Sequence, residues 1–142
     1  MLDINQTTAW IDLLSTYKVN PKYGNTDVID QYLDQRDADP FDSQWMAAHG
    51  DLTAIIDSML VADRKKIEML QDRTSKQIYE TIIEQTSHSD LAAYASDDVR
   101  LIVGFLVTGR VNIFVLEMKE SYERGDLPNV EGMQMFHSAG AQ

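Results

Sequence analysis

The 142-residue chain contains no cysteine, few prolines and few basic residues. Without cysteine it forms no disulfide, and it offers no thiolate metal ligand and no cysteine nucleophile. The absence of disulfides suits a reducing compartment, so we expect a cytoplasmic protein. Pro21, Pro40 and Pro128 are the only prolines, and the long stretches between them are free to form helices.

Signals for export or membrane insertion are also missing from the sequence. Residues 1–6 hold no basic segment followed by an apolar stretch, so no secretory signal peptide is expected. The most apolar stretch, residues 101–116, is shorter than a membrane span and contains Arg110 and Asn112. The sequence therefore predicts a soluble protein.

Positive charge is scarce, because 12 Lys and Arg stand against 23 Asp and Glu, for a net charge of −11. Phosphate backbones and anionic lipids attract basic residues, so we expect neither nucleic acid nor a membrane as a partner. The charge is also uneven: residues 27–63 hold nine Asp and one Arg (net −8), whereas residues 64–76 hold five basic and two acidic residues (net +3). The first of these segments predicts an acidic binding surface, consisting of Asp27, Asp30, Asp34, Asp37, Asp39 and Asp42.

The composition is that of one folded domain. Hydrophobic residues make up 44% of the chain and charged residues 25%, both ordinary for a globular protein, and the length suffices for one core. No repeat, low-complexity tract or linker divides the sequence. We therefore predict a single domain over residues 1–142, in which residues 127–142 form a short amphipathic or flexible tail that carries Val130, Met133, Met135 and Phe136.

Apolar residues recur at helical spacing in the first third of the chain. They predict helices over residues 7–18 and 26–35. Pro40 breaks the pattern, and a short helix follows over residues 43–49, which Gly50 closes.

The stretch from residue 51 to residue 88 contains neither Gly nor Pro. Asp51 is a suitable N-cap for a helix that begins there. Thr74 and Gln77 have the spacing of a capping box, which would start a second helix. The pattern therefore allows either one long helix or two.

Residues 97–124 form the most apolar predicted element, and two interpretations of it compete. Val, Ile and Phe are abundant over residues 99–118, where Thr108 and Gly109 could form the turn of a β-hairpin. However, the apolar residues do not alternate as in a half-buried strand, and small or polar residues recur at every fourth position. This recurrence favours one helix that ends at Gly125.

We therefore predict an all-α fold, an irregular bundle of about five helices around an apolar C-terminal helix. The alternative is an α+β fold with a hairpin at residues 99–118. Gly104 and Thr108 would let a neighbouring helix approach the central one. An arginine within the apolar segment needs a carboxylate or an anion, so Arg110 is a candidate ion-pair or anion-binding residue.

Motifs for catalysis and metal binding are missing. His49, His88 and His137 lack the spacing of metal ligands. Residues 44–49 (Gln-Trp-Met-Ala-Ala-His) resemble metal-dependent helical-bundle enzymes with a histidine on an early helix, but the later pair of histidines four residues apart is absent. The aspartates after residue 37 lack the glycine and glutamate of an EF-hand, and no nucleophile motif or phosphate-binding glycine loop occurs. We predict no enzyme activity, no metal and no cofactor.

The leading hypothesis is a small regulatory protein that binds another protein, of the inhibitor, immunity or phage-accessory type. Its acidic surface would meet a basic partner, because complementary charge speeds association and selects partners. One alternative is a helical sensor or regulatory domain that self-associates as a homodimer through the central helix or the tail. The other is a metal-dependent helical-bundle enzyme.

Overall fold

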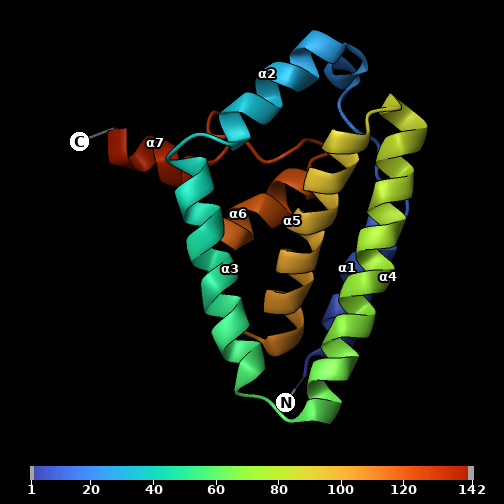
Figure 1. Cartoon of the computed structure of the whole chain (residues 1–142), viewed down its shortest axis with the longest axis vertical. Coiled ribbons are helices and arrows are strands. Elements are labelled where there is room, and N and C mark those ends of the chain that lie inside the picture. Colours follow the sequence, from blue (N-terminus) through green and yellow to red (C-terminus); the bar gives the residue numbers. More distant parts are fainter. Residues whose placement is uncertain (1, 141–142) are drawn as a thin grey trace.

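The computed structural model describes residues 2–140, which form only helices and loops (Figure 1). In chain order the helices are α1 (Ile4–Leu14), the short 3-10 helix η1 (Pro21–Gly24), α2 (Thr26–Arg36), α3 (Phe41–Asp57), α4 (Val61–Thr86), α5 (Ser89–Thr108), α6 (Ile113–Glu123) and α7 (Gln134–Gly140). Because no strand occurs in this range, the all-α prediction is confirmed and the alternative hairpin at residues 99–118 is wrong.

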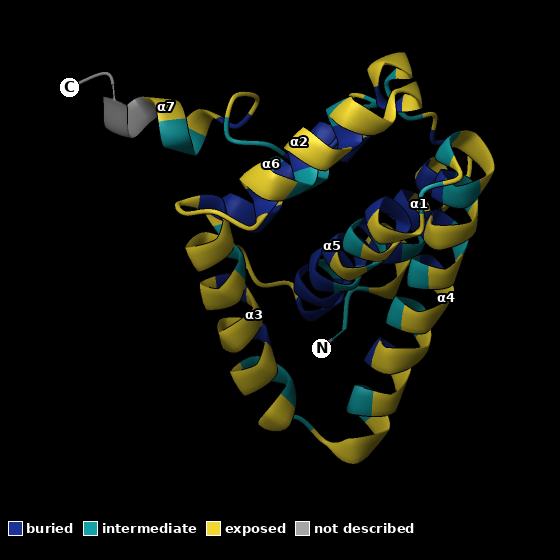
Figure 2. Ribbon diagram, turned by 45° about the horizontal axis from the view of Figure 1, so that its top comes forward, coloured by how far each residue is buried: buried dark blue, intermediate teal, exposed yellow. Residues whose placement is uncertain are grey.

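Helix α5 lies at the centre of the bundle. Twelve of its 20 residues are buried, and from Asp98 onward nearly every residue is. The long helix α4 packs along α5, while α1, α3 and α6 cover other faces of it, so that the dark blue ribbon in Figure 2 concentrates on α5. A helix that is apolar all round is stable only when it is enclosed in this way. The predicted central position of the apolar C-terminal segment is therefore confirmed.

The predicted helix over residues 97–124 is in fact two helices, α5 and α6, which meet at 115°. Gly109 ends α5 in the left-handed conformation (φ +68°), which glycine adopts at little cost. Asn112 then begins α6, because its side-chain oxygen accepts a hydrogen bond from the backbone N–H of Val115. No described helix is by itself long and apolar enough to cross a membrane, although the bent pair α5 and α6 together passes that test by length and composition.

Two predicted boundaries in the middle of the chain are also wrong. Helix α3 runs through Gly50 and continues to Asp57, so Gly50 closes no helix and Asp51 is not an N-cap. The stretch from residue 51 to residue 88 does contain a break, but at residues 58–60. Helix α4 is continuous through Thr74, whose hydroxyl donates a hydrogen bond to the Leu70 carbonyl inside the helix.

Helices α3 and α4 diverge from the loop that joins them and form the two arms of a V, with α5 between them (Figures 1 and 2). Helix α3 crosses α5 where Gly104 leaves room for Leu52. Only Phe41, Ala48 and Leu52 are buried on α3, so most of this 17-residue arm faces solvent.

The segment after α6 packs onto the body of the protein. Leu127 and Met133 are buried, and the Tyr32 hydroxyl donates a 2.7 Å hydrogen bond to the Pro128 carbonyl. The backbone N–H of Met135 donates to the Glu117 carboxylate. The last two residues of the predicted tail, 141 and 142, lie outside the described residues, and dimerisation through this tail stays a prediction.

Candidate binding surface

A buried ion pair connects α2 to the central helix. Ile29, Tyr32 and Arg36 lie on the buried face of α2, and Arg36 points its guanidinium at Asp98 of α5. The two N–H···O bonds measure 2.6 and 2.9 Å, and Asp98 is fully buried while 7% of Arg36 is exposed. A planar guanidinium facing a carboxylate in this way fixes both position and orientation.

The Asp98 carboxylate accepts two further hydrogen bonds. One comes from the indole N–H of Trp45 on α3 (2.9 Å) and the other from the hydroxyl of Tyr122 on α6 (2.8 Å). Arg36 in turn donates a 2.9 Å bond to the Tyr32 hydroxyl. Four helices, α2, α3, α5 and α6, are therefore tied together at one carboxylate.

Aromatic rings complete the surroundings of Arg36. The central carbon of its guanidinium lies 4.4 Å from the ring centre of Phe41 and 5.4 Å from that of Tyr94, both distances at which a cation is attracted to a ring. Burial would lower the pKa of Arg36, but the Asp98 carboxylate more than offsets this and raises it. Arg36 therefore stays charged at every physiological pH.

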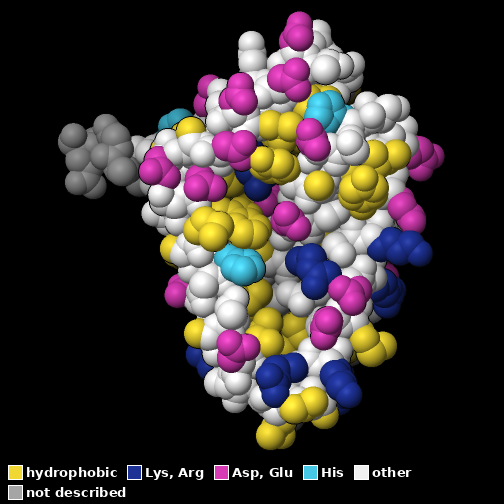
Figure 3. Space-filling view, in the orientation of Figure 1, with side chains coloured by type: hydrophobic (Ala, Val, Ile, Leu, Met, Phe, Trp, Pro, Cys, Tyr) yellow, Lys and Arg dark blue, Asp and Glu magenta, His cyan; other side chains and the backbone are white. Residues whose placement is uncertain are grey.

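The six aspartates predicted as a binding surface are all exposed. Asp27, Asp30 and Asp34 form a stripe on the outer face of α2, opposite the buried residues of that helix. The other three follow in the turn between α2 and α3 and in the first turn of α3, namely Asp37, Asp39 and Asp42. We call these six residues the acidic surface. Figure 3 shows carboxylates gathered over this part of the molecule, whereas Lys and Arg gather lower down, along α4.

The N-terminal half of α5 extends the acidic surface. Its Tyr94 hydroxyl donates a 2.5 Å hydrogen bond to the Asp37 carboxylate, and this bond is the main reason why the pKa of Tyr94 is raised to about 12. His88 lies before the first turn of α5, with Nε2 3.7 Å from an oxygen of Asp30. Asp90 and Asp97, both exposed, add two carboxylates beside those of α2 and α3.

A hollow of about 200 Å³ opens into this surface between α2, α3 and α5. We call it the acidic hollow, and it is lined by Arg36, Asp37, Phe41, Asp42, Trp45, Met46, Tyr94 and Asp97. Its floor therefore includes Arg36, the partner of Asp98. Its walls are largely aromatic, and its rim carries three carboxylates.

Asp97 differs from an ordinary surface aspartate in its electrostatics. Partial burial is the main cause that raises the pKa of Asp97, and the neighbouring Asp98 carboxylate raises it further. Arg100, Arg36 and His49 lower it by a smaller amount. The charge of Asp97 is thus held at some cost to the folded protein.

A second hollow of about 250 Å³ adjoins the first, since Trp45 and Asp97 line both. It lies between the diverging helices α3 and α4 and has α5 as its floor. The ring of His49 stacks on that of Trp45, with ring centres 5.4 Å apart and planes 13° from parallel. The half-buried Trp45 is therefore accessible from both hollows.

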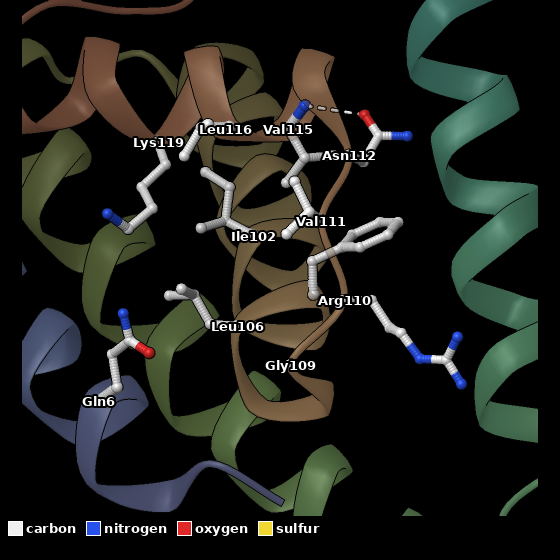
Figure 4. Close-up of a pocket in the computed structure, with 11 residues that line it drawn as sticks. Gln6, Ile102, Leu106, Gly109, Arg110, Val111, Asn112, Val115, Leu116 and Lys119 are labelled. Atoms are coloured by element: carbon white, nitrogen blue, oxygen red, sulfur yellow. Dashed lines mark hydrogen bonds between the residues drawn. The ribbon is translucent and has the colours of Figure 1, made fainter.

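The predicted site residue Arg110 lies elsewhere, in the loop between α5 and α6. It is exposed and is one of the residues that line an apolar hollow of about 210 Å³, from which its guanidinium points away (Figure 4). It forms no ion pair with any residue from 2 to 140. Its role in binding an anion stays a prediction.

The three histidines lie apart. His49 is on α3, His88 caps the N-terminus of α5 by accepting a hydrogen bond from the Leu91 N–H, and His137 is exposed on α7. Within the described range, no three His, Asp or Glu side chains are grouped as metal ligands.

The sequence analysis missed Arg36 and Asp98 as partners. They are 62 residues apart, and no local motif links them. A signal was present nevertheless, because Arg36 continues the buried series of Ile29 and Tyr32 at helical spacing, and Asp98 stands in the middle of α5, directly before its most apolar part. When a small domain has two opposite charges at positions expected to be buried, the two residues are expected to form an ion pair.

A protein-family model with the description "Immunity protein PIM1" matches residues 9–129 of the chain. This range includes α2 to α6 and therefore both the buried ion pair and the acidic surface. No curated protein and no solved structure matches the chain significantly.

Proposed function

Because the chain belongs to the Immunity protein PIM1 family, we propose that it binds and neutralises a basic protein toxin through its acidic surface. Membership of an immunity family implies a protein partner and indicates an inhibitor-type role without catalysis. The basic character of the partner, the surface that meets it and the cytoplasm as the place of encounter are the parts that we propose.

One observation carries the proposal. Between residues 27 and 63 the only Lys or Arg is Arg36, and Arg36 is buried and paired with Asp98. Apart from His49, the ionisable side chains that this segment presents to solvent are therefore all aspartates. A surface of one sign raises the rate of encounter with an oppositely charged protein and disfavours acidic competitors.

Apolar side chains beside the carboxylates also suit a protein interface. Met46 is 56% exposed, and Trp45 and Tyr94 are half-buried at the edge of the acidic surface. Aromatic residues and Met are enriched in protein interfaces, where large side chains enclosed by the partner contribute most of the binding energy. The acidic surface thus combines charge for steering with apolar groups for affinity.

The experiment begins with the candidate toxin encoded in the genomic neighbourhood of this chain. The two proteins are co-expressed and survival is scored, and their affinity is measured by calorimetry at low and high salt. We expect protection, and binding that weakens as salt screens the charges.

Variants locate the contact. Neutralising the α2 stripe with Asp27→Asn, Asp30→Asn and Asp34→Asn should weaken binding about tenfold, as expected for three partly screened charge pairs. The matched control removes three exposed carboxylates of α4, with Glu68→Gln, Glu80→Gln and Glu84→Gln, and should bind nearly as wild type. Equal effects of the two triple variants would mean that net charge alone acts, and unchanged binding by the α2 variant would refute the proposal.

A further inference from the structure

In the acidic hollow, carboxylates and apolar side chains surround the same space. The apolar part is accessible, since Met46 is 56% exposed and the ring of Trp45 is half-buried. A side chain that enters from outside would meet a hydrocarbon surface first and charged groups beside it. This combination suits a side chain with an aliphatic stem and a charged end.

The charges that line the hollow determine whether the charged end of such a side chain should be positive or negative. Arg36 on the floor is neutralised by Asp98, with which it shares two short hydrogen bonds. The rim carboxylates of Asp37, Asp42 and Asp97 remain in excess. Asp37 accepts a hydrogen bond from the neutral hydroxyl of Tyr94, and none of these three carboxylates forms an ion pair with a residue in the described range.

The protein itself shows how a guanidinium is held at this place. Arg36 lies against the rings of Phe41 and Tyr94 while a carboxylate binds its planar end. The outer side of the hollow offers the same two kinds of group, an aromatic face from Trp45 and carboxylates from Asp42 and Asp97. A planar cation uses both better than a compact ammonium does, because it stacks and forms paired hydrogen bonds.

We infer that the acidic hollow takes one arginine side chain of the toxin, with its stem against Trp45 and Met46 and its guanidinium between Asp42 and Asp97. The inference rests on the proposed function and specifies the residue type that the partner inserts. The bound arginine would lie directly above Arg36, and the rim carboxylates separate the two charges.

The state of Asp97 in the free protein agrees with this assignment. Burial and the neighbouring Asp98 raise the pKa of Asp97, so its negative charge is poorly stabilised while the hollow is open. A cation in the hollow would remove that penalty. Part of the binding free energy then comes from relieving a strain of the unbound protein.

The test uses a short peptide as the probe, acetyl-Gly-Ser-Arg-Ser-Gly-amide, titrated into the ¹⁵N-labelled full chain. The chain has two tryptophans and thus two indole N–H signals in the NMR spectrum. Trp45 lines the hollow, whereas Trp10 is 5% exposed and donates its N–H to Glu123, so Trp10 serves as the internal control. We expect a saturable shift of the Trp45 signal and a stationary Trp10 signal.

Two further peptides define the chemistry. Citrulline in place of arginine keeps the shape of the side chain and removes its charge, and it should abolish the saturable shift. Lysine in the same place should bind more weakly than arginine, because it cannot stack or form paired bonds. Equal binding of the citrulline peptide, or tighter binding of the lysine peptide, would overturn the assignment to arginine.

Two variants, each of which removes one negative charge, test whether the arginine peptide binds in the acidic hollow. Asp97→Asn should weaken binding of the arginine peptide roughly three- to tenfold, as expected for one partly buried charge pair. Asp34→Asn removes an exposed carboxylate of α2 outside the hollow and should leave the affinity nearly unchanged. Equal weakening by the two variants, or the absence of any Trp45 shift, would refute the inference. The proposed function is decided separately, since none of the residues changed in its α2 triple variant lines the hollow.

Discussion

Leu52 of α3 lies so close to Gly104 of α5 that a methyl group added to the glycine would collide with the Cδ2 atom of Leu52. The added carbon would also lie 3.2 Å from the side-chain nitrogen of Gln71, which reaches in from α4. Gly104 therefore marks the point where the two arms of the V meet the central helix.

Gly104→Ala should destabilise the protein by about 1–3 kcal/mol, the usual cost of adding a group to a filled core. Alanine is the better helix former by about 1 kcal/mol, so a loss of stability would show that the close approach outweighs helix propensity. Urea unfolding followed by circular dichroism measures the difference. The double variant Leu52→Ala/Gly104→Ala should lose less than the sum of the two single variants, and additive losses would contradict the contact.

Asp98→Ala should cost about 3–5 kcal/mol, because it leaves the guanidinium of Arg36 buried without its partner. The matched control is Asp72→Ala, which removes a carboxylate from the ion pair with Arg100, where the two side chains are 63% and 36% exposed. That loss should be below about 1 kcal/mol. Urea unfolding measures both losses of stability. Similar losses from the two variants would mean that the buried ion pair matters no more to stability than the exposed one.

Asp97→Asn should stabilise the free protein slightly at neutral pH, by less than about 1 kcal/mol, because solvent screens this exposed carboxylate. The pKa of Asp97 is raised in the folded state, so ionisation disfavours folding above that pKa. The advantage of the variant should therefore shrink as the pH falls and vanish below the unfolded carboxyl pKa of about 3.9. Thermal unfolding of both proteins at several pH values measures it, and an advantage that grows toward low pH would be inconsistent with the raised pKa.

Alkaline pH should unfold the protein cooperatively. Five tyrosines have raised pKa values, chiefly through burial, except that a hydrogen bond to Asp37 is the main cause for Tyr94; they are Tyr17, Tyr23, Tyr32, Tyr94 and Tyr122. Unfolded tyrosines ionise near pH 10, whereas these keep their protons in the folded state, so stability present below pH 10 is lost as the pH rises further. Tyrosinate absorbance and helicity should change together. Gradual ionisation of these five tyrosines near pH 10 with helicity intact would contradict their raised pKa values.

The overall class of the fold could be predicted from the sequence because it depends on spacing along the chain. The absence of alternating apolar residues at 99–118 favoured a helix over the alternative hairpin, and Pro40 separated α2 from α3. The break between α5 and α6 was missed although its signals were present. Gly109 and Asn112 are a C-terminal glycine and an N-cap three positions apart, but the apolar residues around them concealed the turn.

At Gly50 the sequence analysis predicted a helix end that does not exist, because this glycine lies within helix α3. A hypothetical side chain there would meet nothing within 4 Å, so tertiary contacts do not require a glycine at this position. The helix continues because Ala48 and Leu52 are buried on either side of it. Tertiary packing thus overrode a local propensity that amounts to about 1 kcal/mol.

For the candidate site, exposure of the six aspartates followed from their density, but the hollow beside them could not be predicted. It depends on the distance between α2 and α5, which the contact of Arg36 with Asp98 sets. That contact joins residues far apart in the chain, and a single sequence carries no direct record of such pairs. The binding role of the aspartates stays a prediction.

The hydrogen bond from Trp45 to Asp98 has a consequence for the kinetics of association. The hydrogen bond to the buried Asp98 carboxylate restrains the indole, so a partner that packs against Trp45 as proposed would meet a side chain already held in place. Little conformational freedom is then lost on docking, and collision with a correctly oriented partner is the slow event. Under the proposed function, a pre-organised Trp45 would favour rapid capture of the toxin, because little rearrangement would precede binding.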